Sequence, residues 1–363
     1  MRILHVLEAL EGGTALHVQT LADGQLAAGH AVGVAVPVVR AWGGTDDVAP
    51  GLEDAGAAVF RIAMHRTAPH PRNAGAALRL GRLVRRWHPD VIHSHSTAAG
   101  VIARVVATPF RVPIVHTPNG VHFSDFEPTR EARLAQAVER AMAPLTRVVI
   151  AASASEADVL ARVYPMSKVR VIPNAIAVGP APPTLPERFR AVAVNRFVYQ
   201  KSPEQVVRVM AALRARVPDA EAVLVGYGAL EPQVRALVAA LDPGIVVERG
   251  DGAAAIARAS ALVLASRWEG APYVLLEAMN LGRPTVASDV VGSRDTVVHG
   301  ETGFLFPWND PGAGGQRLAE LATDSERVRH MGAAARRRLE RHYAIEGMVN
   351  AVVDVYERAV SSR

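Results

Sequence analysis

Residues 190–217, "RAVAVNRFVYQKSPEQVVRVMAALRARV", contain the unit from which the fold is built. An apolar run of strand length passes into a polar loop, and a helical segment follows from Ser202. Strands that alternate with helices in this way favour parallel sheets with crossover helices. Ligands of such sheets bind beyond the carboxyl ends of the strands, which makes the loop "NRFVYQKSPE" at residues 195–204 a candidate binding loop.

The same alternation extends along most of the chain. Ser153 and Glu156 have the spacing of a capping box and predict the start of another helix. Besides residues 190–197, strands are predicted at residues 2–7, 31–39, 89–96, 112–120, 147–153, 221–228, 261–266 and 284–289. Helices are predicted to end near Gly29 and to cover residues 202–217, 231–241 and 272–282.

A proline-rich stretch, "AVGPAPPTLPER" at residues 177–188, interrupts the alternation and is the best candidate for a linker. The sequence therefore predicts two Rossmann-like, doubly wound parallel-sheet domains, at residues 1–178 and 186–344, that face a cleft. A last helix at about residues 345–363 follows the second unit and is free to cross back to the first domain.

Composition restricts the chemistry and the compartment. Half of the 363 residues are hydrophobic, which is enough for two buried cores. Cysteine is absent, so disulfides and thiolate chemistry are excluded and a reducing compartment is the simplest setting. Residues 1–7 lack the pattern of a signal peptide, and no run of 18 apolar residues exists. We expect a cytoplasmic protein.

The net charge of +5 raises the question of an anionic partner. In residues 76–90, apolar side chains recur at helical spacing, and the opposite face carries Arg79, Arg82, Arg85 and Arg86. Such a basic amphipathic helix could contact an anionic membrane at its inner face, or could simply be the solvated face of a helix packed on a sheet. A nucleic-acid partner is not expected.

The segment "EGAPYVLLEAM" at residues 269–279 combines two carboxylates with a helix start. Pro272 suits the first helical turn, whose N–H groups form an anion site. Glu269 precedes the helix and Glu277 lies within it, an arrangement that suits a ligand with hydroxyls near a phosphate. An ordinary helix with solvated glutamates is the alternative.

Two cations and two glycine turns are candidates for phosphate binding. Arg196 can fork two phosphate oxygens and Lys201 can supply a point charge, although both could be ordinary surface cations. Glycines permit a close backbone approach at two strand ends: Gly226 and Gly228, and Gly12 and Gly13. The fingerprint G-x-G-x-x-G is missing from the first turn, which disfavours a dehydrogenase.

Histidines are concentrated in the first half of the chain. His93 and His95 share one face of a strand, and His116 and His122 lie near the next strand end. A metal site is disfavoured because no thiolate and no obvious third ligand joins the pair. Hydrogen bonding to a polar substrate is the preferred interpretation, with His93, His95 and His122 as acceptor-side candidates.

Taken in order, these segments closely resemble the retaining glycosyltransferases of family 4, which have the GT-B fold. "EGAPYVLLEAM" is similar to the family's E-x7-E motif in its common form EGLPNVLLEAM. "NRFVYQKS" resembles GRLVPQKG, "LVGYGAL" resembles LVGDGPL, and "HGETGFLF" resembles a later family segment. Residues 12–36 are similar to the family's glycine-rich first loop and helix, so the likeness spans essentially the whole chain.

The resemblance implies a role for each matching residue. Arg196 and Lys201 would hold the diphosphate of a nucleotide-sugar donor, favoured to be a UDP-sugar, and Glu277 would bind the ribose. Glu269 would hold the transferred sugar together with Gly270, Ala271, Pro272, Tyr273 and Val274. Further donor contacts are implied at Gly12, Gly13, Gly226 and Gly228. The resemblance also implies transfer with retention and no catalytic metal or other cofactor.

One departure concerns catalysis. Relatives carry a histidine where this chain has Asn119, while His116 occupies an earlier position, so the histidine's usual role cannot simply be transferred. The Asn119 amide could bind a sugar hydroxyl, or His122 could substitute. The residues expected to carry catalysis are Arg196, Lys201, Glu269, His116 and Asn119. Asn195 replaces a family glycine, and we expect it to tolerate a left-handed backbone there.

The acceptor is less constrained than the donor. "HSHSTAAGVIARVVA" and "VHTPNGVHF" look most like members that build cell-surface polysaccharides on lipid-linked sugars. A soluble metabolite or antibiotic as acceptor is the alternative. A non-catalytic nucleotide-sugar-binding partner subunit and an epimerase of the same fold also remain open.

Overall fold

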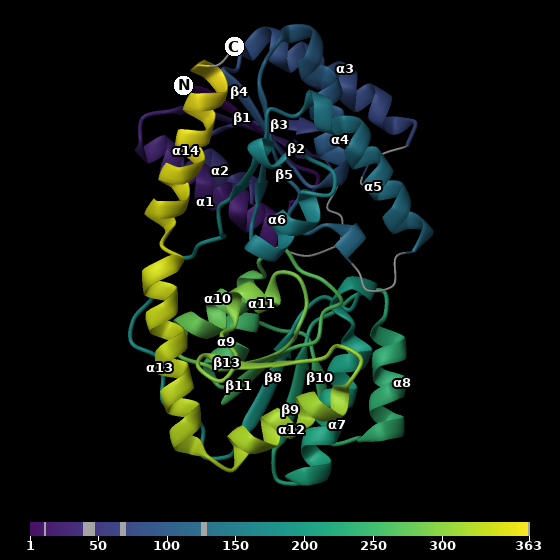
Figure 1. Ribbon diagram of the computed structural model, residues 1–363, viewed down its shortest axis with the longest axis vertical. Helices are drawn as coiled ribbons and strands as arrows, with labels where there is room; N and C mark the ends of the chain where they lie inside the picture. Colours follow the sequence, from purple (N-terminus) through teal and green to yellow (C-terminus); the bar gives the residue numbers. More distant parts are fainter. Residues whose placement is uncertain (11, 39–47, 66–69, 125–128, 362–363) are drawn as a thin grey trace. The chain divides into compact units, whose positions relative to one another are not determined.

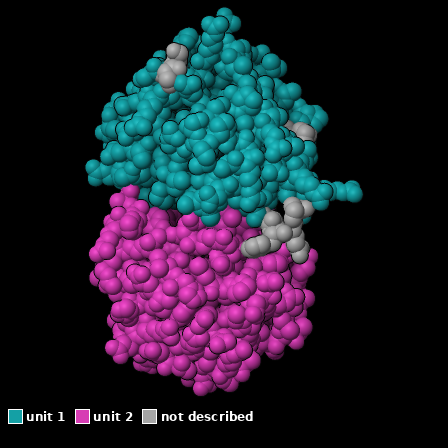
Figure 2. Space-filling view, in the orientation of Figure 1, with its two compact units in different colours: residues 1–175, 345–363 teal, residues 176–344 magenta. Residues whose placement is uncertain are grey.

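The chain divides into two units, which Figures 1 and 2 show in the same orientation. A computed structural model describes residues 1–10, 12–38, 48–65, 70–124 and 129–361. Residue 11, the first of the glycine-rich loop, lies outside these ranges. Unit 1 comprises Met1–Ala175 and Ile345–Arg363, and unit 2 comprises Ile176–Ala344.

Unit 1 is built on a seven-stranded parallel sheet with the order β3-β2-β1-β4-β5-β6-β7. Almost every residue of strands β1, β2 and β4 is buried, because helices cover both faces of the sheet. The strands are β1 (Arg2–Val6), β2 (Ala31–Pro37), β3 (Ala58–Ile62), β4 (Val91–His95), β5 (Ile114–Thr117), β6 (Val148–Ala151) and β7 (Val169–Val171).

The helices of unit 1 bury their apolar stripes against the sheet and each other. Leu80 and Val84 of α3 pack with Ile102 of α4 on β1 and β4. The helices are α1 (Gly13–Ala27), α2 (Ala49–Asp54), α3 (Arg72–Trp87), α4 (Thr97–Ala107), α5 (Arg130–Met142), α6 (Ala154–Leu160) and α14 (Ile345–Ser361), with short 3-10 turns η1 (Thr108–Phe110) to η4 (Met166–Lys168).

Helix α14 belongs to unit 1 although it follows unit 2 in the sequence. Its Met348, Val352 and Tyr356 pack in one cluster with Ile3 and Val115 of the sheet. Figure 1 shows α14, in yellow, beside α1. The predicted return of the last helix to the first domain is confirmed.

Unit 2 repeats the plan with a six-stranded parallel sheet, order β10-β9-β8-β11-β12-β13. Val206 and Met210 of α7 pack against the sheet in the largest apolar cluster. The strands are β8 (Arg190–Val194), β9 (Glu221–Val225), β10 (Val246–Glu248), β11 (Ala261–Leu264), β12 (Thr285–Ser288) and β13 (Gly303–Phe306). The helices are α7 (Pro203–Arg216), α8 (Glu231–Leu241), α9 (Gly252–Ala257), α10 (Tyr273–Asn280), α11 (Ser293–Thr296), α12 (Pro311–Ala322) and α13 (Ser325–His342).

The predicted class, two Rossmann-like doubly wound units, is confirmed. Four strands went unpredicted, β3, β7, β10 and β13, and these are the two edges of each sheet. Residues 177–188 contain neither helix nor strand, as expected of a linker. Among the helices that the structure describes, none combines the length and apolar composition that a bilayer crossing requires.

Strand order reverses at one place in each sheet. In unit 1, β1 has β2 on one side and β4 on the other; in unit 2, β8 lies between β9 and β11. The loops after two such strands lead to helices on opposite faces, which leaves room for a ligand between them. The loops after β8 and β11, together with helix α10 that follows β11, contain most of the residues that the sequence predicted to bind the donor.

Candidate functional site

An ion pair joins the two loops at the reversal point of unit 2. Lys201, in the turn η5 (Tyr199–Lys201) after β8, donates to both carboxylate oxygens of Glu269, after β11, at 2.6 and 2.8 Å. Glu269 is only 3% exposed and also accepts from the Ser266 hydroxyl at 2.5 Å. A buried carboxylate held by one ammonium and one hydroxyl is fixed in position and strongly polar.

Backbone contacts hold these two loops in register. The Arg267 amide donates to the Gln200 carbonyl at 2.8 Å, and the Gln200 side chain donates to the Trp268 carbonyl at 3.1 Å. Gly292 has φ +84°, and a Cβ there would lie 2.4 Å from the Gly270 carbonyl oxygen. Sequence reasoning missed Gln200 and Gly292 because their partners are distant in sequence, and it missed Ser266 although its partner Glu269 is only three residues away.

Helix α10 supplies the positive end of this site. Pro272 is its N-cap, so the first-turn amides of Tyr273 and Val274 have no partner inside the helix. Glu277 lies one turn further on and is half-buried. Burial, and secondarily the charge of Asp251, raise the pKa of Glu277. The loops and α10 thus present positive groups beside two carboxylates, which suits a phosphorylated ligand that also carries hydroxyls.

Arg196, Gly226 and Gly228 lie at the ends of neighbouring strands β8 and β9, and Arg196 is half-buried. A Cβ at Gly226 would lie 1.9 Å from the Asn195 carbonyl oxygen, and one at Gly228 would lie 2.5 Å from that of Phe197. Glycine therefore has a structural role at both positions, because a side chain there would collide with the backbone of the loop after β8. Asn195 is not left-handed, contrary to expectation; the turn instead places Ser202 at φ 48°.

In unit 1, Gly12 is the exposed N-cap of α1, with φ +78° and no heavy atom within 4 Å of a built Cβ. Its backbone conformation favours glycine, and the space above it is open. Gly13 is the first residue of α1 and is also exposed. Both follow β1, at the reversal point of the first sheet.

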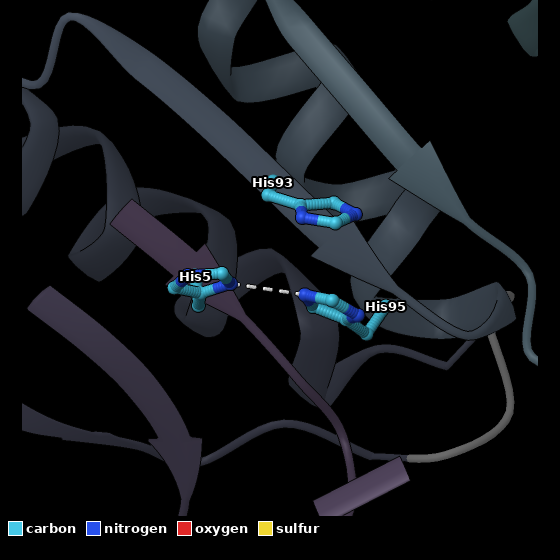
Figure 3. Close-up of side chains that lie close together, drawn as sticks. All are labelled: His5, His93 and His95. Carbon is cyan, nitrogen blue, oxygen red and sulfur yellow. Dashed lines mark hydrogen bonds between the residues drawn. The ribbon is translucent and has the colours of Figure 1, made fainter. Parts of the chain in front are cut away.

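Three histidines form a buried cluster behind this loop (Figure 3). His5 of β1 pairs in register with His93 of β4, and His95 is two residues further along β4. All three are fully buried, and the rings of His93 and His95 are 4.1 Å apart. Complete burial is the opposite of what we expected of acceptor-side residues at His93 and His95.

The imidazole nitrogens of this cluster are mostly engaged within the protein. His5 Nε2 lies 2.8 Å from Gln25 Oε1, and His5 Nδ1 lies 3.1 Å from His95 Nε2. His93 lies 2.5 Å from the Tyr356 hydroxyl and 2.7 Å from that of Thr117. These contacts connect β1, β4, β5 and α14, so the cluster has a structural role as a polar network inside the core.

His5 is the third ligand that sequence reasoning did not find. One nitrogen from each of the three histidines lies within 4.8 Å of the others, close enough for a metal ion. A metal would have to displace the His5–His95 hydrogen bond and one hydroxyl contact of His93. Hydrogen bonds engage both nitrogens of His5 and of His93, whereas the buried His95 Nδ1 has no hydrogen-bond partner among the described residues.

His116 lies away from the solvent, contrary to its expected place beside a transferred sugar. It is 1% exposed, its Nδ1 lies 3.0 Å from the Ser94 hydroxyl, and its Nε2 lies 3.7 Å from Glu139. Arg104 donates to both oxygens of Glu139 at 2.7 and 3.0 Å, and Tyr164 donates to the same carboxylate. Burial, and then the charge of Arg104, lower the pKa of His116 to about 3.

Asn119 and His122 occupy the loop after β5. Asn119 is half-buried with φ 58°, a left-handed conformation that asparagine adopts more readily than most residues. The next amide, Gly120, donates to Glu156 at 2.8 Å, and Ser153 caps α6 by accepting from the Glu156 amide. The loop is thereby anchored to α6, while His122 remains exposed.

Family models match both halves of the chain. The model for Glycosyltransferase Family 4 matches residues 11–179, and the model for glycosyl transferases group 1 matches residues 182–338. The putative glycosyltransferase EpsD of Bacillus subtilis is 26% identical, with 82% of this chain and 84% of that protein covered. The UDP-Gal:alpha-D-GlcNAc-diphosphoundecaprenol alpha-1,3-galactosyltransferase of Escherichia coli is 25% identical, with 84% of each covered.

Solved structures share the fold over the whole chain. Sucrose-phosphate synthase from Thermosynechococcus elongatus superposes with a TM-score of 0.83 at 20% identity, covering 100% of both chains. Anabaena Alr3699/HepE, crystallised with UDP-glucose, gives a TM-score of 0.81 at 17% identity, covering 99% of this chain and all of that one.

The buried histidines predict a loss of stability in mild acid. Burial lowers the pKa of His5 to about 4 and that of His17 to about 3, and it also lowers the pKa of His93 and His95 well below the usual value. Unfolding therefore takes up protons below about pH 6.5, and stability falls from there toward pH 4, by up to ~1.4 kcal/mol per pH unit for each such group.

Urea unfolding at pH 7.5, 6.0 and 5.0 measures this slope. His17→Gln should reduce the proton uptake by about one. An unchanged slope in His17→Gln would contradict the assignment.

The Lys201–Glu269 pair predicts strong energetic coupling. Lys201→Met leaves a buried carboxylate without its cation and should lower the free energy of unfolding by about 3 kcal/mol. Glu269→Gln should also lower the free energy of unfolding. The double variant should lose less than the sum, with a coupling of about 1–3 kcal/mol by urea unfolding.

The exposed pair Arg294–Asp289, 3.0 Å apart, is the matched control. Arg294→Met combined with Asp289→Asn should show a coupling below about 1 kcal/mol. Equal coupling in the two cycles would contradict a buried pair at Lys201.

Proposed function

Because the chain belongs to the family 4 glycosyltransferases, which have the GT-B fold, we propose that it transfers a sugar from a UDP-sugar to a hydroxyl of a lipid-linked or cell-surface polysaccharide precursor. The observation that carries the proposal is the Lys201–Glu269 pair at the reversal point of unit 2, directly before the N-terminus of α10. It combines a reachable cation with a carboxylate at the place where an α/β sheet binds its ligand.

Each side chain of the site has a part in binding the donor. Arg196 and Lys201 would neutralise the diphosphate, with the N-terminus of α10 adding its dipole. Glu269 would accept hydrogen bonds from sugar hydroxyls, and Glu277 from the ribose. The raised pKa of Glu277 reflects partial burial that ribose hydroxyls could compensate by hydrogen bonding.

Donor binding changes the partner of Lys201. Without donor its ammonium is shared by both Glu269 oxygens. A diphosphate would compete for this charge, and Glu269 would turn part of its accepting capacity to the sugar. Ser266 and the Gln200–Trp268 contacts would keep Glu269 in place during the exchange.

Transfer with retention is the mechanism we propose. The bond between the sugar C1 and the diphosphate oxygen breaks, and the acceptor oxygen bonds to C1 on the same face. The acceptor proton passes to the leaving diphosphate, so no protein nucleophile is required. Arg196, Lys201 and the α10 amides would stabilise the charge that develops on the leaving group, and we propose that they do so without a metal ion.

The lipid-linked acceptor is proposed from the relatives. The Escherichia coli enzyme is named for a diphosphoundecaprenol-linked acceptor and a UDP-galactose donor. The chain covers 84% of that relative, so both halves of the protein take part in the likeness. Transfer to such an acceptor would take place at the inner face of a membrane.

Release of nucleoside diphosphate tests the donor assignment. Incubated with UDP-, GDP-, ADP- and dTDP-sugars, the protein should release UDP by slow hydrolysis, measured by chromatography and unchanged by EDTA. Lys201→Ala should lower this release at least 100-fold, because about 3 kcal/mol of charge stabilisation is lost.

Lys168→Ala is the matched control, because Lys168 is the only other lysine of the chain and donates to the Ala143 and Thr146 carbonyls in unit 1. It should keep the release rate. Equal rates in the two variants would contradict the phosphate role of Lys201, and an isomerised donor sugar would indicate an epimerase.

The anomeric configuration of the product tests the mechanism. With an α-linked UDP-sugar and a diphosphate-linked lipid acceptor, the new linkage should be α, as read from the proton and carbon couplings at C1 by NMR. A β-linked product would overturn retention while leaving the donor assignment intact.

A further inference from the structure

The outer face of α3 carries four exposed arginines, Arg79, Arg82, Arg85 and Arg86. Within the described part of the chain, none of these four guanidinium groups makes a hydrogen bond or an ion pair. An unneutralised row of guanidinium groups on one helix face is a strong local positive charge. Figure 1 shows α3 on the outside of unit 1, beside α4.

A groove of about 550 Å³ lies between α3 and the edge strand β3. Arg79, Arg82 and Arg86 line it from the helix, and Arg61 lines it from the strand. Its apolar lining comes from Val59, Phe60, Ile62, Leu83 and Trp87. The groove therefore joins an apolar surface to the guanidiniums of Arg79, Arg82 and Arg86, with Arg61 at its strand side.

Leu78 adds an exposed apolar side chain to the same helix face. It is 67% exposed, and it precedes Arg82 by four positions and Arg85 by seven. Residues at these spacings lie on one side of a helix. A large aliphatic side chain in the middle of a basic, solvent-facing surface suits insertion among lipid headgroups.

We propose that this groove binds the phosphate headgroup of anionic membrane lipids and, with Leu78, docks unit 1 on the surface of a bilayer. The guanidiniums of Arg61, Arg79, Arg82 and Arg86 can fork phosphate oxygens, and the apolar lining accepts the first carbons of the lipid chains. The groove thereby matches both the charged headgroup and the apolar chains of an anionic lipid.

A nucleic acid fits this surface less well. Stacking of bases requires an open aromatic face. The Arg2 guanidinium lies 5.0 Å from the centre of the Trp87 ring, over one of its faces. Phe60 approaches Trp87 edge-on with ring centres 6.3 Å apart. The aromatic rings therefore form a wall of the groove and do not offer a platform for bases.

The groove is separate from the sites of the proposed transfer reaction. In the sheet order, β2 lies between β3 and β1, so the groove is at an edge of the sheet and one strand separates it from the reversal point at β1 and β4. Arg196, Lys201, Glu269 and Glu277 of the proposed donor site belong to unit 2. Membrane docking can therefore be tested apart from sugar transfer.

Vesicle co-sedimentation of the full chain tests the proposal. The protein should bind vesicles of three parts phosphatidylcholine to one part phosphatidylglycerol, and should bind pure phosphatidylcholine at least 100-fold more weakly. Each arginine near an anionic surface contributes about a five-fold factor, so Arg79→Gln with Arg82→Gln and Arg86→Gln should reduce binding about 100-fold.

The matched control removes the same charge from another helix. Arg329→Gln with Arg337→Gln and Arg341→Gln alters exposed residues of α13 and should reduce binding less than about five-fold. Arg61→Gln separates the groove from the helix alone, because Arg61 lies on β3. It should weaken binding about five-fold, and no effect would overturn the groove as the site.

Further measurements exclude other occupants and keep the two proposals apart. Inorganic phosphate at constant ionic strength should not displace the vesicles; displacement would assign the groove to a free phosphate compound. Binding of single-stranded DNA without vesicle binding would assign it to nucleic acid.

UDP release should be unchanged in the triple α3 variant, whereas a failure of UDP release in the wild type would reject sugar transfer without affecting vesicle binding.

Discussion

The reversal of strand order in each parallel sheet is the constraint on which the rest of this structure depends. Because crossover connections are right-handed, the helices that follow β8 and β11 lie on opposite faces of the sheet, and the loops before them diverge. Those loops carry Lys201 and Glu269, which meet at 2.6 Å although 68 residues separate them. Gly226 and Gly292 remove side chains where backbones must approach, so the same constraint explains why glycine is required there.

The two lysines show why an arginine-rich chain retains an ammonium at particular places. Lys201 donates to both oxygens of one carboxylate, and Lys168 donates to two carbonyls at the end of the turn η3 (Ala143–Leu145). In both cases a compact cation at the end of a flexible stem reaches a narrow acceptor group. The buried Arg104 meets a different demand, because its planar fork engages Glu139 and Tyr164 together. Charge alone therefore does not decide which cation a position accepts.

The interior strands of both sheets could be predicted from the sequence, whereas the edges could not. Interior strands such as β11 and β12 are fully buried, so their sequences are continuous runs of apolar or small residues. Edge strands β7 and β10 have three residues each and alternate little. Partners from distant strands were also beyond reach: the pattern "HSHS" places His93 and His95 on one face, but nothing local indicates that His5 is paired beside them. Asn195 was expected to adopt a left-handed backbone and does not, whereas Asn119, for which no such conformation was predicted, does. The residue type alone does not show which turn requires this conformation, because that depends on the elements packed around each turn.

The engagement of the unit 1 histidines has a consequence for acceptor recognition. His93 and His116 hold β4 and β5 together from inside and fix where the following loops begin, and His95 connects β4 to His5 of β1. The surface of those loops, where Asn119 is partly exposed and His122 is exposed, lies outside this network. Loop side chains can change without disturbing the buried network, whereas a change in the network would shift every loop at once. We propose that the acceptor meets these loops, so that one core can serve different acceptors through residues that do not hold the sheet together.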